Sequence, residues 1–272
     1  MKSNLSQVFR IQKFLNQISY PDAYRSAREI SNFLDTNNKL SENKILDKIK
    51  NGEPWEYICN YTTFCENTFK VTRDTLIPRI ESEQIVYDTQ KTLRNSNIKH
   101  IIDVGTGSGC LIISLKKILE SPYSFWATDI SSKALKVAEY NEKNILNTQE
   151  IHWIKTDLIK DIPKLDGKVF IIANLPYIPT GQYQKLDKNV KDYEPKNALD
   201  GGKDGLKYYR KLLTQIKQKH LAVKYLYIET EESVFNSTKE LIHSYFPDSH
   251  IEEKQDCFSK KRFLFTTLLE QE

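Results

Sequence analysis

The chain has 272 residues, a formal net charge of +4 and 39% hydrophobic residues, which is enough apolar material for a packed core. This composition excludes a wholly disordered chain and a strongly basic nucleic-acid coat. No apolar run approaches the roughly 20 residues that a membrane span needs, and the first residues lack a secretory core. The four cysteines form no CxxC pair, so we expect no metal site, no disulfide framework and a cytoplasmic location.

Residues 1–54 are predicted to form a small helical domain. Apolar residues recur at helical spacing in a first segment, Pro21 opens a second, and Ser41 precedes a third. Nothing in this pattern indicates chemistry, so we expect a packing or docking role. Aromatic and β-branched residues over 55–72 then predict a β-hairpin that links this domain to the rest of the chain.

Over residues 73–272 strand and helix patterns alternate, after a helix that begins near Glu81. This alternation predicts an α/β domain with a doubly wound, mostly parallel sheet covered on both faces. The predicted strands are 100–104, 124–129, 151–155, 168–173, 222–229 and 262–268, and the predicted helices are 108–119, 132–145, 203–218 and 231–244. Residues 174–202 carry no periodic pattern, and unpatterned segments of this length are usually functional.

The first motif is a glycine-rich turn between the strand at 101–104 and the helix that follows. It consists of Gly105, Thr106, Gly107, Ser108 and Gly109. Glycines let a ligand lie against bare backbone, and the start of the helix offers unpaired N–H donors. The GxGxG spacing differs from the GxGxxG of dinucleotide sites, and a purely structural turn is the alternative.

Acidic residues end the next two predicted strands. Asp129, at the tip of the second strand, is placed to accept both hydroxyl groups of a ribose, although it could instead cap the helix that starts after Ser131. Asp157, at the end of the third strand, could reach an adenine amino group or could simply be a turn residue. Together with the glycine turn, these carboxylates favour a nucleoside ligand.

The third motif follows the apolar strand 168–173 and consists of Asn174, Leu175, Pro176 and Tyr177. In doubly wound folds this edge of the sheet is where ligands bind. The side chain of Asn174 and the free carbonyl of Pro176 can hold a planar NH₂ group by its two hydrogens, and Tyr177 offers a flat face for stacking. An unrelated structural loop would be the alternative for this motif alone.

In this order, the motifs resemble a class I S-adenosylmethionine-dependent methyltransferase that methylates amino groups. More narrowly, the chain resembles the HemK-type family, which methylates a glutamine side-chain amide in peptide chain release factors. The resemblance runs from about residue 52 to the end and rests on the following stretches: Gly52-Glu53-Pro54 with Tyr57-Ile58, Thr75-Leu76-Ile77-Pro78-Arg79 with Glu81 and Glu83, Asp103 to Gly109, Tyr193-Glu194-Pro195, Ala198-Leu199, Gly201-Gly202, Asp204-Gly205-Leu206, and Phe258 to Phe265.

The resemblance implies a Rossmann-like sheet of seven strands behind a small helical domain, S-adenosylmethionine as cofactor, and release factors as protein partners, with no membrane. The residues implied to bind the cofactor are Gly105, Thr106, Gly107, Ser108, Gly109, Asp129, Asp157 and Asn174. Those implied to hold the substrate are Asn174, Leu175, Pro176 and Tyr177, and the catalytic ones among them are Asn174, Pro176 and Tyr177.

The chain departs from the family pattern in four places. Leu175 stands for the first proline of Asn-Pro-Pro-Tyr, Ile80 for proline and Ser82 for threonine, and the usual glycine pair before the fifth strand is absent at KHLAVKYLY. The Asn-Leu-Pro-Tyr form also resembles ribosomal RNA adenine dimethylating enzymes. An adenine-N6 methyltransferase acting on DNA or RNA is therefore the alternative, and nucleic acid is expected as a partner only in that case. A binding module that has lost catalysis is a second alternative.

Overall fold

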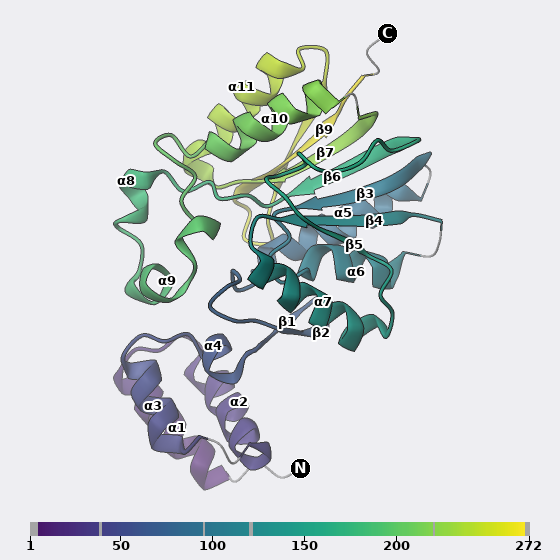
Figure 1. The fold of residues 1–272 in the computed structure, drawn as a ribbon. Helices are drawn as coiled ribbons and strands as arrows, with labels where there is room; N and C mark the ends of the chain where they lie inside the picture. Colours follow the sequence, from purple (N-terminus) through teal and green to yellow (C-terminus); the bar gives the residue numbers. More distant parts are fainter. Residues whose placement is uncertain (1–4, 38–39, 95, 120–121, 220, 270–272) are drawn as a thin grey trace.

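The N-terminal part of the chain is a helical bundle with its own apolar core. The computed structural model describes residues 5–37, 40–94, 96–119, 122–219 and 221–269 (Figure 1). The bundle contains α1 (Leu5–Gln17), α2 (Ala23–Thr36) and α3 (Glu42–Lys50). Each helix buries one apolar face, with Ile11, Ile30 and Ile45 fully enclosed, as the helical spacing of these residues predicts.

Residues 55–72 differ at their start from the predicted hairpin. They begin with a short helix, α4 (Trp55–Cys59), and the hairpin of β1 (Tyr61–Phe64) and β2 (Asn67–Lys70) follows. Trp55 and Ile58 lie three residues apart and complete the core of the bundle, and this burial selects a helix over a strand. The division of the chain at residues 54 and 72 stays a prediction, and its outer limits, residues 1 and 272, fall outside the described residues.

The α/β part contains a seven-stranded sheet in the order β5-β4-β3-β6-β7-β9-β8, which confirms the predicted fold class. Its strands are β3 (Ile98–Val104), β4 (Ser124–Asp129), β5 (His152–Lys155), β6 (Lys168–Ala173), β7 (Val223–Glu229), β8 (His250–Gln255) and β9 (Lys261–Thr267). Neighbouring strands run parallel from β5 to β7, while β9 is antiparallel to both β7 and β8. The strand order reverses between β3 and β6, which is the point where doubly wound folds bind ligands.

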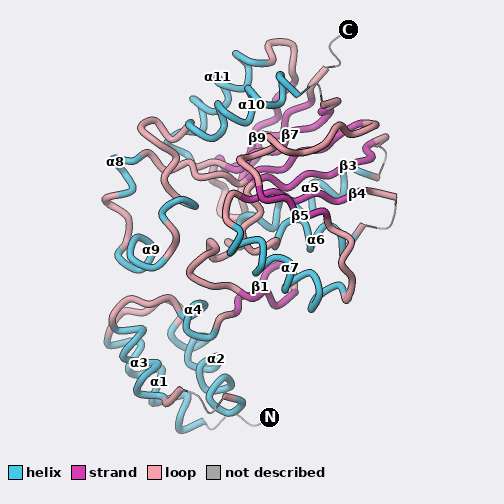
Figure 2. Tube along the Cα trace, viewed as in Figure 1, coloured by secondary structure: helices cyan, strands magenta, loops and turns pink. Residues whose placement is uncertain are grey.

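Helices cover both faces of the sheet, with α10 and α11 on one side and α5, α6 and α7 on the other (Figure 2). Their bounds are α5 (Glu83–Leu93), α6 (Cys110–Ile118), α7 (Ser132–Leu146), α10 (Lys207–Lys219) and α11 (Phe235–Tyr245). Each face of the sheet has its own apolar core, and successive residues of β6 point alternately into the two. Ile171 belongs to the same core as Leu212 of α10, and Ile172 belongs to the same core as Ile112 of α6. Because β6 is buried on both faces, its sequence is a continuous apolar run over residues 169–173.

The segment from Asn174 to Gly202 folds into short helical turns and lies between the sheet and the N-terminal bundle (Figure 1). Its turns are α8 (Thr180–Tyr183), α9 (Lys188–Tyr193) and the 3₁₀ turn η2 (Lys196–Ala198). The two ends of the segment are paired, because Ile178 N–H donates to the Leu199 carbonyl at 3.0 Å and Gly201 N–H donates to the Ile178 carbonyl at 2.8 Å. The segment is therefore an ordered wall beside the carboxyl ends of the strands.

Within the described ranges, no helix has an apolar stretch long enough to cross a lipid bilayer.

Candidate active site

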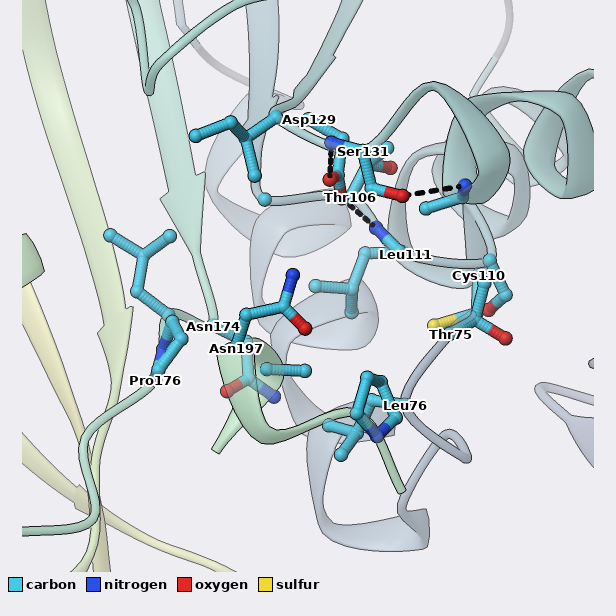
Figure 3. A pocket seen from close by; sticks show the side chains of 18 of the residues that line it. Thr75, Leu76, Thr106, Cys110, Leu111, Asp129, Ser131, Asn174, Pro176 and Asn197 are labelled. Carbon is cyan, nitrogen blue, oxygen red and sulfur yellow. Dashed lines mark hydrogen bonds between the residues drawn. The ribbon is translucent and has the colours of Figure 1, made fainter. Parts of the chain in front are cut away.

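A pocket of about 250 Å³ opens at the carboxyl ends of β3, β4 and β6. Figure 3 shows Asp129, Ser131 and Thr106 on one side of it, Asn174 and Pro176 on another, and Leu76 on a third. All three predicted motifs therefore contribute to one pocket, although they are separated by up to about seventy residues of sequence.

The glycine turn shapes the wall that carries β3 into α6. Gly105 has a φ of 75°, and a Cβ atom built there would lie 2.8 Å from the side chain of Leu175, so glycine is required at this position. A Cβ atom built at Gly107, in contrast, would meet no atom within 4 Å. Open space therefore lies in front of the Gly107 backbone, where a ligand can approach.

Below the turn, the Thr106 hydroxyl donates to the buried carboxylate of Asp103 at 2.6 Å. Burial raises the pKa of Asp103 to about 7, and the hydrogen bond from Thr106 opposes this rise. Asp103 thus stabilises the glycine turn from the buried side, through its hydrogen bond with Thr106. Thr106, in the predicted cofactor set, uses its hydroxyl for this contact and is one of the residues that line the pocket.

The Asp129 carboxylate lies at the pocket and is held by backbone donors. Gly107 N–H donates to one oxygen at 3.0 Å and Ser131 N–H donates to the other at 2.8 Å. Ser131, whose hydroxyl accepts from Ala134 N–H at 3.2 Å, caps α7. The cap is therefore Ser131, and Asp129 is oriented toward the glycine turn with lone pairs left for further donors. Burial raises its pKa, which its backbone donors oppose.

Asp157 also lines the pocket, but its carboxylate already has a partner. It forms an ion pair with Lys211 of α10, and its carbonyl accepts a hydrogen bond from Gln215 at 3.1 Å. These contacts anchor the turn after β5 to α10. A contact from Asp157 to an adenine amino group stays a prediction.

Asn174, the first residue after β6, lies at the pocket with its amide oriented by Ser82. Its Nδ2 donates to the Ser82 hydroxyl at 3.3 Å, which leaves Oδ1 as the acceptor available to a ligand. Among the described residues, no hydrogen bond reaches the carbonyl oxygen of Pro176. The two acceptors predicted to hold an NH₂ group are therefore unengaged, and both belong to residues that line the pocket.

Leu175 contributes through its backbone and its packing. Its N–H donates to the Tyr209 hydroxyl at 3.3 Å, a hydrogen bond that a proline at this position could not make. The same hydroxyl lies within hydrogen-bond distance of the carbonyls of Leu175 and Glu229, which share its single proton, so Tyr209 of α10 joins the turn to the end of β7. The side chain of Leu175 is buried beneath Gly105.

Two glycines let the late loop lie close against the Pro176–Tyr177 backbone. A Cβ atom at Gly201 would lie 2.6 Å from the Pro176 carbonyl oxygen, and one at Gly205, where φ is 76°, would clash with the Tyr177 carbonyl oxygen. Only glycine fits such approaches. The Tyr177 side chain is half-buried, and burial raises the pKa of its hydroxyl, so the ring stays neutral.

The sequence reasoning missed the supports of this site. Ser82 and Tyr209 hold the Asn174–Leu175 backbone and side chain from helical turns that contain no motif of their own. Leu76 and Asn197 line the pocket as well. Ser82, Leu76 and Asn197 lie in the two segments that resemble the HemK-type family, at 75–83 and 193–206, and this was their only sequence signal. Tyr209 lies outside both segments and carried no signal.

The pocket fits S-adenosylmethionine, because open space at the Gly107 backbone adjoins a carboxylate with free lone pairs and an apolar wall. The fold agrees: the ribosomal protein L11 methylase from Lactobacillus delbrueckii subsp. bulgaricus superposes with a TM-score of 0.50 at 18% identity, over 74% of this chain and 84% of that chain. The hMettl16 catalytic domain gives 0.56 at 16% identity, over 75% and 76%. The α/β part therefore has the class I methyltransferase fold.

Sequence comparison identifies the family. A release factor glutamine methyltransferase of Flavobacterium psychrophilum is 33% identical over 237 residues, covering 85% of this chain and 81% of that protein. One from Lactococcus lactis is 29% identical over 263 residues, covering 96% and 92%. Residues 86–176 also match the family model described as ribosomal protein L11 methyltransferase (PrmA). The chain belongs to the release factor glutamine methyltransferase family, whose methyl donor is S-adenosylmethionine.

Proposed function

We propose that this protein transfers a methyl group from S-adenosylmethionine to the side-chain amide nitrogen of a glutamine in peptide chain release factors. The observation that carries the proposal is the turn after β6, where Asn174 and Pro176 line the same pocket as Asp129. The family's named activity supplies the acceptor class. A cytoplasmic location is part of the proposal, because the four free thiols suit a reducing compartment.

The proposed cofactor contacts follow the pocket wall. Asp129 accepts from the ribose hydroxyl groups, and the backbone of the glycine turn, Gly105 to Gly109, lies against the amino-acid portion. Asp157 receives the adenine amino group beside its ion pair with Lys211. Two facts support this arrangement: the open space in front of Gly107 and the free lone pairs of Asp129.

When bound, the cofactor supplies an electrophilic methyl group. The residues of the chain must make a poor nucleophile react, because the lone pair of an amide nitrogen is delocalised into its carbonyl. Asn174 Oδ1 and the Pro176 carbonyl accept the two NH₂ hydrogens, and the ring of Tyr177 stacks on the planar amide. Alignment of this kind can lower a barrier by roughly 7–11 kcal/mol. The two carbonyl dipoles also stabilise the positive charge that develops on nitrogen, and the proton leaves to water.

The charges of the segment 178–202, which lies beside Asn174 and Pro176, favour a protein acceptor over a base that is rotated out of a nucleic-acid strand. A nucleic-acid path would present unpaired Lys and Arg side chains to phosphates. In the segment 178–202, Glu194 instead pairs with Arg79, and Lys196 pairs with Asp200 at 3.6 Å. The segment carries as many acidic as basic residues and so suits the surface of a protein loop.

The test is a parallel methylation assay with labelled S-adenosylmethionine and three acceptors: a release factor, duplex DNA and ribosomal RNA, each at low and moderate salt. We expect label in the release factor alone. Label in nucleic acid that falls steeply with salt, with an unmodified release factor, would establish the adenine alternative instead.

A further inference from the structure

A chain of two hydrogen bonds leads from the Asn174 side chain to a buried carboxylate outside the pocket. Asn174 Nδ2 donates to the Ser82 hydroxyl at 3.3 Å, and that hydroxyl donates to Glu229 Oε2 at 2.6 Å. Ser82 is 3% exposed and Glu229 is 2% exposed. The three residues come from the end of β6, the 3₁₀ turn η1 (Ile80–Ser82) and the end of β7, so the contact depends on the whole fold.

The direction of these bonds is set by the carboxylate. An ionised carboxylate can only accept, so the Ser82 hydroxyl must donate to Glu229. The oxygen of Ser82 then has only lone pairs to offer Asn174, and it binds the NH₂ end of the amide. Asn174 therefore presents its carbonyl oxygen to the pocket, because the flipped amide would place its own oxygen against the lone pairs of Ser82.

We propose that Glu229, acting through Ser82, is a positioning residue that holds the Asn174 amide with its carbonyl oxygen toward the acceptor NH₂ group. This inference rests on the proposed methyl transfer, since only an NH₂ acceptor requires an oxygen there. The opposite orientation would set two NH₂ groups against each other and abolish the grip. The family departure at Ser82 keeps the hydroxyl that this relay needs.

The buried carboxylate of Glu229 does not serve to stabilise the fold. Burying an ionised group without a direct ion pair opposes folding, and a well-packed apolar residue would serve stability better. Burial raises the pKa of Glu229 to about 7, and the bond from Ser82, the charge of Arg262 on β9 and the nearby side-chain amide of Asn174 oppose this rise. The titratable groups that face the Glu229 site from other elements are Glu81 on η1, Tyr177 after β6, Tyr209 on α10 and Arg262.

A pH dependence follows from the direction of the relay. When the pH falls below about 7, Glu229 gains a proton and can donate to Ser82. The Ser82 hydroxyl is then free to donate to Asn174, which stabilises the flipped amide. Activity should therefore be present above this pH and decline as the pH falls through it.

The experiment compares the parent protein with Glu229→Gln, Ser82→Ala, Ser82→Thr and the control Asp88→Asn. Asp88 on α5 is a buried carboxylate that also accepts from a hydroxyl, Tyr227 at 2.7 Å, but it lies outside the pocket lining. For each protein, kcat and KM on a release factor are measured from pH 5.5 to about 9, together with the melting temperature. The side-chain NH₂ signals of Asn174 are followed by NMR, with Asn174→Ala providing the assignment.

We expect Glu229→Gln and Ser82→Ala to lose about tenfold to a hundredfold in kcat, with KM nearly unchanged. Ser82→Thr should restore kcat, and Glu229→Gln should lose the decline at low pH. Hydrogen exchange of the Asn174 NH₂ should accelerate in Glu229→Gln and not in Asp88→Asn. Parental kcat in Glu229→Gln, or an equal loss in Asp88→Asn, would overturn the proposal.

The NMR readout separates this inference from the proposed function. A parent protein without activity on release factors, whose Asn174 NH₂ is nonetheless protected only when Glu229 and Ser82 are intact, would refute the function and leave the relay standing. An active parent whose Asn174 NH₂ is unaffected by Glu229→Gln would refute the relay alone.

Discussion

The carboxylate of Asp129 is held open toward the pocket by two backbone N–H groups, those of Gly107 and Ser131. The helix that follows is capped by Ser131 and needs nothing from Asp129. A carboxylate fixed in this way loses little conformational entropy on binding a ribose, because its rotamer is already chosen. The position of the residue therefore suits ligand binding better than helix capping.

Asp129→Ala should weaken the binding of S-adenosylmethionine. Two charge-assisted hydrogen bonds are lost, which costs about 1.5–3 kcal/mol, or on the order of 10–150-fold in the dissociation constant. Isothermal titration of the two proteins measures the change. Asp166→Ala, which removes an exposed carboxylate elsewhere, is the control and should bind as the parent does. Equal affinities for parent and Asp129→Ala would remove Asp129 from the site.

Asn174→Ala should leave a folded protein that binds S-adenosylmethionine and transfers methyl groups very slowly. The substitution deletes one of the two acceptors that align the NH₂ group, so the loss should appear in kcat. Steady-state kinetics on a release factor checks this, with cofactor titration and the melting temperature as evidence of folding. Near-parental kcat would contradict the proposed grip.

Residues of the site could be predicted where the chemistry is local in sequence. Asn174 stands directly after an apolar strand and Asp129 is the last residue of another, so their place at the sheet edge follows from the pattern alone. Ser82 and Glu229 are 147 residues apart, and neither belongs to a recognisable catalytic pattern. Only the assembled sheet brings them together, which is why the sequence could not reveal the relay.

At the scale of elements, a buried ion pair connects the segment before η1 to the wall segment. Arg79 pairs with Glu194, whose side chain is almost fully enclosed, and the other Glu194 oxygen accepts from Ile77 N–H at 3.2 Å. Tyr57 of α4 adds a hydrogen bond to the Thr75 carbonyl at 2.7 Å. These contacts hold together three of the segments that resemble the HemK-type family.

Glu194→Ala should destabilise the protein, because it leaves the Ile77 N–H and Arg79 without their partner. We expect the free energy of unfolding to fall by about 2 kcal/mol, the cost of an unsatisfied buried donor with a partly screened charge. Urea denaturation measures this loss. Lys196→Ala breaks the exposed i,i+4 pair with Asp200 in the same segment and should change stability by less than about 0.5 kcal/mol. Similar losses in both variants would contradict this ranking.

Most elements could be predicted from apolar patterning, and the exceptions have clear physical causes. The strands β4 and β6 match their predicted bounds. β6 contains the continuous apolar run VFIIA, as expected for a strand covered on both faces, and β4 has the apolar core FWA between polar ends. The edge strand β8, HIEEKQ, is mostly exposed and has one apolar residue, so its pattern carries no strand signal. The seventh strand was expected only from the family resemblance. In α4, tertiary burial of Trp55 overrides the strand propensity of its aromatic residues.

At the scale of the whole molecule, Asn141 of α7 shows how the connecting hairpin reaches the site. Its side chain accepts from Lys70 N–H at 2.8 Å and donates to the carbonyls of Lys70 and Ser108, at 3.0 and 2.9 Å. One buried amide thereby ties β2 to the glycine turn. The hairpin between the helical bundle and the sheet is thus connected to the pocket through the Asn141 side chain, which bonds to the backbone on both sides.

The most direct measurement of the central claim is tandem mass spectrometry of a purified release factor after incubation with this protein and S-adenosylmethionine. The account predicts one added methyl group, located on the side-chain amide nitrogen of a single glutamine. It also predicts that the Asn174→Ala protein leaves that glutamine unmodified. A release factor that stays unmethylated under conditions in which the protein methylates adenine, or a methyl group on any residue other than glutamine, would contradict it.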